Sequence, residues 1–158
     1  MKIVTANNLE LDFDFSESAK CWMSSGLVNN VKVDFEIYQE EYLQEKIDWD
    51  YFKEFVSKLE NSNNLPELII KSEKVLLSLA EAFGSSISQQ EKIDDFKMEF
   101  VGLSFKGEVE NLFIKSYAYS LWFNIVNKEN PYSYVDPYGD YITDVEGQFI
   151  VGARRQQC

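Results

Sequence analysis

The stretch VKVDFEIYQEEYLQEKIDWDYFKEFVSKL, residues 31–59, decides the fold class because its hydrophobic period changes partway along it. In residues 31–37, apolar side chains alternate with charged ones, which is typical of a strand with one buried face. From Asp48, a residue type that favours the N-cap of a helix, apolar side chains recur at helical spacing. The helical positions are Trp49, Phe52, Phe55, Val56 and Leu59. The stretch therefore predicts a strand followed by an amphipathic helix.

The residues before this stretch predict a second strand and two turns. Leu and Phe alternate with acids in residues 9–15, which again indicates a half-buried strand. Residues Ser24–Gly26 and Asn29–Asn30 are of the types that favour turns. We therefore expect the chain to turn twice before the strand at residues 31–37.

The residues after it predict more helix. Asn61–Asn64 ends the first helix, and Pro66 suits the first turn of the next segment. An apolar stripe then leads to Gly84, at the position of a glycine that ends a helix. Residues 66–84 fit either one helix or a short piece followed by a helix from Ser72.

From about Lys97 apolar side chains again recur at every second residue, which predicts strands for the second half of the chain. A first strand approaches a turn at Lys106–Gly107, with a bulge near Val101–Gly102. A long strand follows over residues 109–123. Three small residues share one face of it and leave room for close packing by a helix of this chain or by a partner's side chain: Ser116, Ala118 and Ser120.

The last predicted elements are two turns and a hairpin. Asp136–Gly139 has the residues of a type I turn, and Glu146–Gly147 joins strands at 141–145 and 148–153. The order of strands, helices and strands predicts an α+β fold in one domain, residues 1–158. We expect a mainly antiparallel sheet with two or three helices packed on one face.

The charge of the chain restricts its partners. Asp and Glu number 27 against 15 Lys and Arg, a net charge of −12. Nucleic-acid binding and anionic membranes both need the opposite sign, whereas a basic protein would be attracted. The alternative is that the charge serves only solubility.

Missing residue types exclude several chemistries. The chain has no His, so no Ser-His-Asp or Cys-His pair and no His-containing zinc site can form. It also lacks the glycine-rich phosphate-binding motifs. Its two cysteines, Cys21 and Cys158, are too few for a disulfide scaffold. The first residues lack a secretory apolar core, so we expect a cytoplasmic location and no cofactor.

Charged residues near the C-terminus give the remaining candidate site. Asp136, Asp140 and Asp144 recur every four residues, but not in the order of a calcium loop, and we interpret them as a solvated hairpin rim. Arg154 and Arg155 are adjacent on a strand and should project to opposite faces. We expect one to bind a carboxylate and the other to stay exposed.

Acidic and tyrosine residues are densest between Asp34 and Glu60. This stretch holds nine acids against three lysines, a net −6 and half of the chain's −12. Such a surface could cover a basic substrate groove, since acids steer association and Tyr gives contact area. The alternative is a solvated connection between strand and helix. The predicted partner-binding residues are Glu36, Tyr38, Glu40, Glu41, Tyr42, Glu45, Asp48 and Asp50.

Two C-terminal segments carry a resemblance to a known family. Tyr134-Val135-Asp136-Pro137-Tyr138-Gly139-Asp140-Tyr141 and Ile150-Val151-Gly152-Ala153-Arg154-Arg155 resemble the C-terminal hairpin of domains encoded in bacterial polymorphic-toxin loci. A small, acidic, His-free α+β chain also resembles the immunity proteins of these loci, including those of contact-dependent growth inhibition. The resemblance implies a cytoplasmic antidote that covers one cognate toxin, for example a basic nuclease domain. No functional residue carries over from it.

Two alternatives remain open at this point. One is a carboxylate-based hydrolase, with or without a divalent metal. The other is a structural or scaffold subunit. The missing catalytic groups favour a protein that acts by binding another protein and not as an enzyme.

Overall fold

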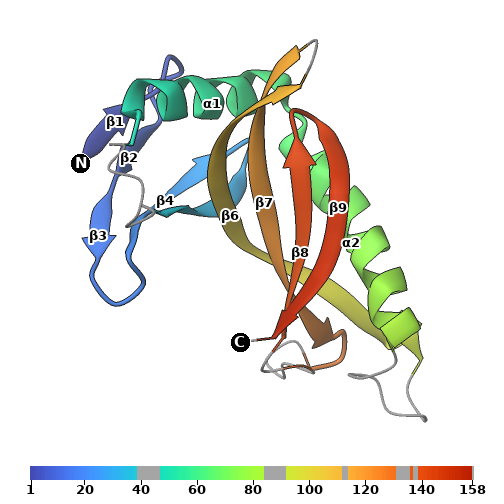
Figure 1. Cartoon of the computed structure of the whole chain (residues 1–158). Helices are drawn as coiled ribbons and strands as arrows, with labels where there is room; N and C mark the ends of the chain where they lie inside the picture. Colours follow the sequence, from blue (N-terminus) through green and yellow to red (C-terminus); the bar gives the residue numbers. More distant parts are fainter. Residues whose placement is uncertain (39–46, 84–91, 112–113, 131–135, 137–138, 158) are drawn as a thin grey trace.

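The computed structural model describes residues 1–38, 47–83, 92–111, 114–130, 136 and 139–157 (Figure 1). In chain order its elements are β1 (Lys2–Val4), β2 (Glu10–Asp12), β3 (Asp14–Ser16), β4 (Cys21–Val28), β5 (Val31–Tyr38), α1 (Trp49–Ser62), α2 (Leu65–Phe83), the 3₁₀ turn η1 (Ile93–Asp95), β6 (Phe96–Asn111), β7 (Ile114–Asn127), β8 (Gly139–Glu146) and β9 (Phe149–Gln157).

Seven strands form one sheet in the order β3-β4-β5-β6-β7-β8-β9, and β1 pairs with β2 in a separate small sheet. All neighbours in the large sheet are antiparallel except β5 and β6, which are parallel. A hairpin cannot join parallel neighbours, and the segment containing α1 and α2 supplies the long connection that they need. The predicted α+β fold with a mainly antiparallel sheet is confirmed.

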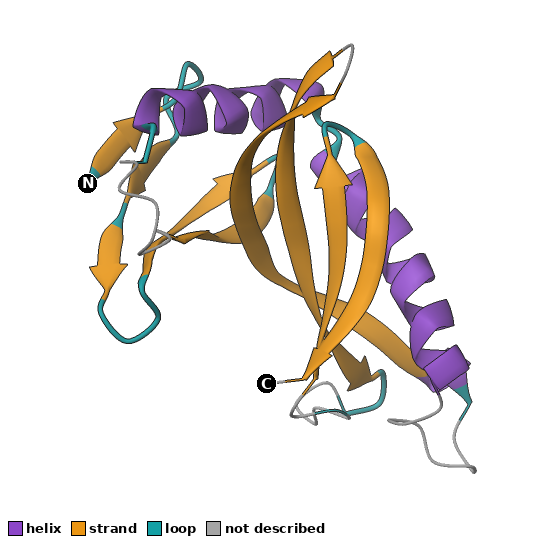
Figure 2. Cartoon of the chain, in the orientation of Figure 1, coloured by secondary structure: helices purple, strands orange, loops and turns teal. Residues whose placement is uncertain are grey.

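Both helices pack on one face of the bent sheet (Figure 2). The ring of Phe52 in α1 lies 5.9 Å from Phe35 of β5 and 5.3 Å from Phe105 of β6, measured between ring centroids. On α2, the buried hydroxyl of Ser72 shares a hydrogen bond of 2.8 Å with Thr143 of β8. The prediction of helices on one face is therefore confirmed, and the other face, called here the open face, has no helix within the described residues.

The ends of the helices follow the predicted signals. The Asp48 carboxylate accepts a hydrogen bond of 3.0 Å from the backbone N–H of Tyr51 and caps α1. Asn63 ends that helix in the left-handed conformation, with φ of 50°. α2 is one continuous helix that contains Pro66 as its second residue, which decides between the two open alternatives. Gly84 lies outside the described residues.

The predicted strand at residues 9–15 is broken at Phe13. The backbone N–H of Phe13 donates to the carbonyl of Met1, and the Met1 ammonium donates to the carbonyl of Phe13, each at 2.6 Å. Since these backbone groups are engaged by the N-terminus, the chain changes partner there. β2 pairs with β1 before Phe13, and β3 pairs with β4 after it.

Two predicted turns are wrong. Ser24–Gly26 lies within β4, which pairs residue for residue with β5 up to the two-residue turn Asn29–Asn30, where φ is 52° and 64°. Lys106–Gly107 bends β6 without reversing it, because the register with β7 shifts between Phe105 and Gly107. Gly107 adopts a φ of 110°, which a residue with a Cβ rarely adopts, so it permits a bulge inside a long strand.

The remaining strand predictions are confirmed in part. A register shift between Phe100 and Gly102 marks the predicted bulge, and β8 and β9 form the predicted hairpin around Gly147. The backbone N–H of Gly139 donates to the carbonyl of Asp136 at 3.2 Å, as in a β-turn. The two central residues of that turn lie outside the described residues.

Candidate functional site

Four polar side chains form a row across the open face, called here the polar row: Glu36, Ser104, Ser120 and Asp144. Each is the direct cross-strand neighbour of the next, over β5, β6, β7 and β8. Their chain neighbours face the helices, since Phe35 contacts Phe52 and Tyr119 lies 5.1 Å from Phe55 between ring centroids. Strand alternation therefore places the polar row on the opposite face. Ser104 and Ser120 are 4% and 0% exposed, so they form its floor.

An acidic pocket of about 570 Å³ adjoins the Glu36 end of the polar row. It is lined by side chains from β4, β5, β6, β7 and β8, so it spans most of the width of the sheet. The lining residues that carry the argument below are Asp34, Glu36, Tyr38, Gly102, Trp122 and Asp140. The volume lies within the roughly 300–1,000 Å³ of pockets that bury a ligand.

Hydrogen bonds hold two of the pocket carboxylates in place. Ser25 donates its hydroxyl to Asp34 at 2.6 Å, and the Lys32 ammonium lies 3.8 Å from the same Asp34 oxygen. Glu36 Oε2 accepts from the Tyr38 hydroxyl at 2.7 Å and from the Ser104 hydroxyl at 3.5 Å. Both bonds to Glu36 end on one oxygen, so within the described residues Oε1 keeps its acceptor capacity.

The titratable groups beside Glu36 stay neutral. Burial, and then the hydrogen bond to Glu36, raise the pKa of the Tyr38 phenol well above its ordinary value. Cys21, directly opposite Tyr38 in the register, is fully buried, and burial followed by the Glu36 charge raises the pKa of its thiol. A raised pKa keeps Cys21 as a thiol at neutral pH, which is the opposite of an activated nucleophile.

Trp122 lines the pocket and also carries an unsatisfied donor. Its indole Nε1 is buried and has no hydrogen-bond partner among the described residues. A buried indole N–H usually has an acceptor, because leaving it without one costs free energy. The indole N–H has no accessible surface, so its missing hydrogen bond is a cost to stability and not a contact offered to a ligand.

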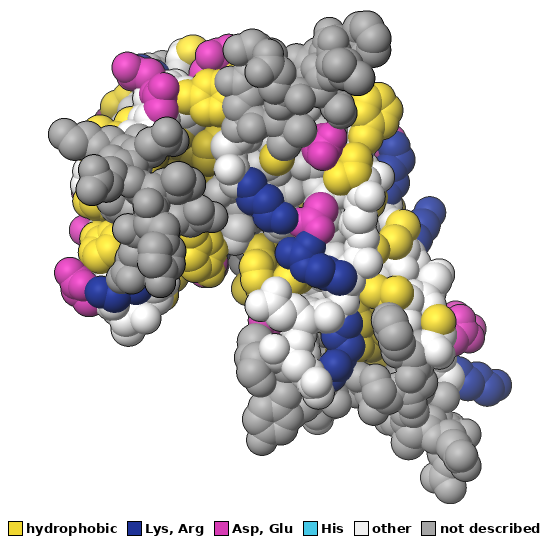
Figure 3. Space-filling view, in the orientation of Figure 1, with side chains coloured by type: hydrophobic (Ala, Val, Ile, Leu, Met, Phe, Trp, Pro, Cys, Tyr) yellow, Lys and Arg dark blue, Asp and Glu magenta, His cyan; other side chains and the backbone are white. Residues whose placement is uncertain are grey.

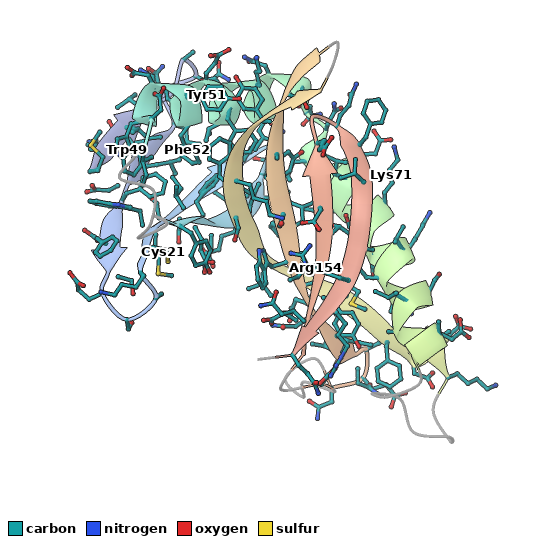
Figure 4. All side chains as sticks on the ribbon, viewed as in Figure 1. Cys21, Trp49, Tyr51, Phe52, Lys71 and Arg154 are labelled. Atoms are coloured by element: carbon teal, nitrogen blue, oxygen red, sulfur yellow. The ribbon has the colours of Figure 1, made fainter. Side chains whose placement is uncertain are left out.

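The other end of the polar row carries surplus positive charge. Asp144 accepts hydrogen bonds from Lys106 at 2.6 Å, from Ser120 at 2.7 Å, and from Arg154. Two cations thus share one carboxylate, and burial together with the Arg154 charge lowers the pKa of Lys106. Basic side chains gather at the centre of the open face in Figure 3, and Arg154 lies over the β8–β9 part in Figure 4.

The structure separates the predicted partner-binding residues that it describes. Glu36 and Tyr38 lie on the open face, whereas Asp48 and Asp50 lie at the start of α1, on the helix side. Glu40, Glu41, Tyr42 and Glu45 lie outside the described residues. Lysines of the chain also pair with two acids of the stretch, since Lys32 lies near Asp34 and Lys58 lies 3.1 Å from Glu54.

The small residues Ala118 and Ser120, which the sequence predicted to share one face of a strand, lie on the open face, and Trp122 was missed in the sequence. Ala118, Ser120 and Trp122 have the same parity on β7 and so share a face, and that face is turned away from both helices. The room left by the small residues is therefore not filled by α1 or α2. Asp34, Gly102 and Asp140 become neighbours only through the order of the strands in the sheet.

The interpretation of the C-terminal acids as a solvated rim is wrong for two of them. The side chains of Asp136 and Asp144 are 8% and 25% exposed, and each binds an arginine. Arg154 and Arg155 do face opposite sides of β9, as predicted, but both bind carboxylates, since Arg155 donates to Asp136 at 2.6 Å. Asp140, the third acid, lines the acidic pocket.

Two searches of the described residues bear on the type of site. No three Cys, Asp or Glu side chains in the described ranges are grouped so that they could hold a metal ion. None of the helices there is both long and apolar enough to cross a bilayer. Comparisons with protein-family models, curated proteins and solved structures found no match to this chain.

Gly102 allows β5 and β6 to approach beside the pocket. A Cβ at this position would lie 2.6 Å from the backbone oxygen of Asp34, which cannot rotate away. We expect Gly102→Ala to lower the free energy of unfolding by about 1–3 kcal/mol, because the parallel pair must separate. Urea denaturation measures the change.

Gly152→Ala is the matched control on the same face. Its Cβ would meet Asp144 at 3.5 Å, an ordinary contact, so we expect a change within about 0.5 kcal/mol. Equal effects of the two substitutions would show that the contact with Asp34 does not limit residue 102.

Proposed function

We propose that this chain is a cytoplasmic immunity protein that binds a cognate bacterial toxin and neutralises it by covering the toxin's basic active-site surface. The observation that carries the proposal is the acidic pocket on a sheet face that no described helix covers. Three carboxylates and one ammonium line it, so it complements a basic surface, and such complementarity speeds and orients association.

Apolar side chains around the pocket support a protein partner. Four of them are between 42% and 64% exposed: Met23, Leu27, Tyr38 and Val101. Met and aromatic residues are enriched in interfaces, and an apolar rim would exclude water from the charged contacts inside it. The surface therefore combines the two components expected of a binding face.

The test is co-expression with the product of the adjacent gene. We expect the chain to protect the producing cells and to copurify with that product as a stable complex. Absence of both protection and complex would overturn the proposal.

Charge neutralisation tests whether the acidic pocket is the binding surface. The triple variant Asp34→Asn, Glu36→Gln, Asp140→Asn should slow association by roughly tenfold or more at low salt, because it removes the steering charge. The control triple Glu67→Gln, Glu73→Gln, Glu81→Gln changes the net charge equally but lies on α2. Equal association rates for both variants, measured by stopped flow, would remove the open face from the proposal.

A further inference from the structure

We infer that the outer edge of β9 binds an extended, basic segment of the protein partner, which adds an eighth strand to the seven-stranded sheet. The inference rests on the proposed function for the existence of a protein partner. It goes beyond that function by naming the element of this chain with which the partner pairs and the form in which the partner binds.

β9 forms one edge of the large sheet (Figure 1). Among the described strands it pairs with β8 alone, so every second residue directs its backbone N–H and C=O groups away from the sheet. Another extended chain matches the spacing of these groups, and its own backbone supplies the complementary donors and acceptors. The chemistry of the edge therefore specifies a β-strand as its occupant.

The two edges of the sheet differ in how well they are protected against strand addition. β3, at the opposite edge, has only three residues, and so short a strand offers little to pair with. β9 has nine, and it contains neither Pro nor Lys, the residues that natural edge strands use for protection. Phe149 and Val151 of β9 are 69% and 55% exposed, although both side chains are large and apolar. An edge with these properties would promote aggregation if it had no partner.

A bulge limits the regular pairing surface to the second part of β9. Val151 has no counterpart in the register with β8, whereas the six residues Gly152–Gln157 pair one to one with Gly139–Asp144. The only charged residues among these six are Arg154 and Arg155, and each donates a hydrogen bond to a carboxylate of this chain. The segment therefore presents its backbone to a partner strand with both of its charges already paired.

The same six residues argue against a second copy of the chain as the occupant. In a symmetric antiparallel pair, the residue on the twofold axis lies opposite itself. An axis near the middle of Gly152–Gln157 falls at Arg154 or Arg155 and would place two arginines side by side, which is destabilising. Each chain also carries a net charge of −12, which repels a second copy and attracts a basic segment. The occupant is therefore a segment of a different protein in which Lys and Arg outnumber Asp and Glu.

Amide hydrogen exchange on the whole chain, free and in complex with the product of the adjacent gene, tests the pairing. In the free chain the amides of residues 152–157 should form two classes, since alternate N–H groups bond to β8 and the others face outward. We expect the outward class to exchange fast in the free chain and to slow by roughly tenfold or more in the complex. One segment of the partner should slow in the same way, and it should carry an excess of Lys and Arg.

Proline at two positions of β9 gives matched variants. Ala153 and Gln156 lie three residues apart, so one directs its N–H to β8 and the other directs it outward, and the exchange classes identify which. Proline lacks the N–H and is tolerated where that group faces away from an edge strand, so the outward variant, Ala153→Pro or Gln156→Pro, should keep its Tm. It should weaken the complex by roughly tenfold, because a hydrogen bond to the partner strand is lost. Ala153→Ser and Gln156→Ala keep the N–H and should bind as the native chain does.

Three results would overturn the inference and leave the proposed function intact, since the toxin is still bound in each. They are a stable complex in which the outward amides of β9 exchange as fast as in the free chain, an unchanged affinity of the outward proline variant, and a slowed partner segment in which acids are in excess. Absence of any complex would overturn the proposed function and this inference with it. A dimer of the free chain that protects the same amides, detected by sedimentation, would also overturn the inference, because the edge would then bind a second copy.

Discussion

Phe52→Ala is expected to lower the free energy of unfolding by about 3–5 kcal/mol, the range for removing a large aromatic side chain from a core. Phe52 is 0% exposed, and its ring touches five others, at centroid distances from 5.3 to 6.4 Å. They are Phe13, Phe35, Trp49, Phe55 and Phe105. This one side chain therefore links α1 to the N-terminal strands and to both members of the parallel pair.

Guanidinium denaturation monitored by far-UV circular dichroism measures the loss. Phe52→Leu is the control, since it keeps most of the apolar volume and is expected to cost less than about 1.5 kcal/mol. If the alanine variant were as stable as the leucine variant, the ring contacts around Phe52 would not be the link between helix and sheet.

The elements of this fold could largely be predicted from hydrophobic period. The stripe of α1 buries Phe52, Phe55, Val56 and Leu59, all of them assigned from helical spacing, and the cap at Asp48 is formed as expected. The spacing of apolar residues does not specify which strands pair with each other, so the parallel contact of β5 with β6 could not be predicted. The break at Phe13 depends on two hydrogen bonds exchanged with Met1, a contact between residues 12 positions apart in the chain.

The candidate site was harder to predict, for a different physical reason. The acidic stretch was identified by density along the chain, but a strand directs neighbouring side chains to opposite faces and the following helix lies behind the sheet. Glu36 and Asp50 are therefore separated, although the sequence places them 14 positions apart in one acidic run. The pocket instead joins Asp34 and Glu36 with Trp122 and Asp140, which are distant in the sequence.

The polar row was not predicted from the sequence, because two of its members are buried serines. Ser104 and Ser120 are almost fully buried on the face away from the helices. The sequence indicated Ser120 only as a small residue that leaves room for packing, and it gave no sign of Ser104 or of the carboxylates that the two hydroxyls bind. Burial is tolerated because each hydroxyl donates to a carboxylate, Ser104 to Glu36 and Ser120 to Asp144. The polar row thus runs from the acidic pocket to the cationic end of the open face as two hydrogen-bonded pairs, Glu36 with Ser104 and Asp144 with Ser120.

Asp136→Ala is expected to cost about 2–3 kcal/mol of stability, because it leaves the partly buried Arg155 guanidinium without its carboxylate. The two side chains are only 8% and 18% exposed, and Arg155 Nε donates to Asp136 at 2.6 Å. The bond fastens the segment before β8 to the last strand, β9, so its loss should also loosen the C-terminal hairpin. Urea denaturation gives the first quantity, and amide hydrogen exchange in β9 gives the second.

A double-mutant cycle separates the ion pair from simple loss of packing. Arg155→Met removes the charge but keeps an apolar chain, so the double variant Asp136→Ala, Arg155→Met should regain most of the stability lost by Asp136→Ala alone. That recovery follows because the main cost of the single change is a partly buried cation left without its carboxylate, and not the missing contact. If the two losses of unfolding free energy were additive in the double variant, Asp136 would stabilise the hairpin through other neighbours. Arg155 would then contribute nothing through its contact with Asp136.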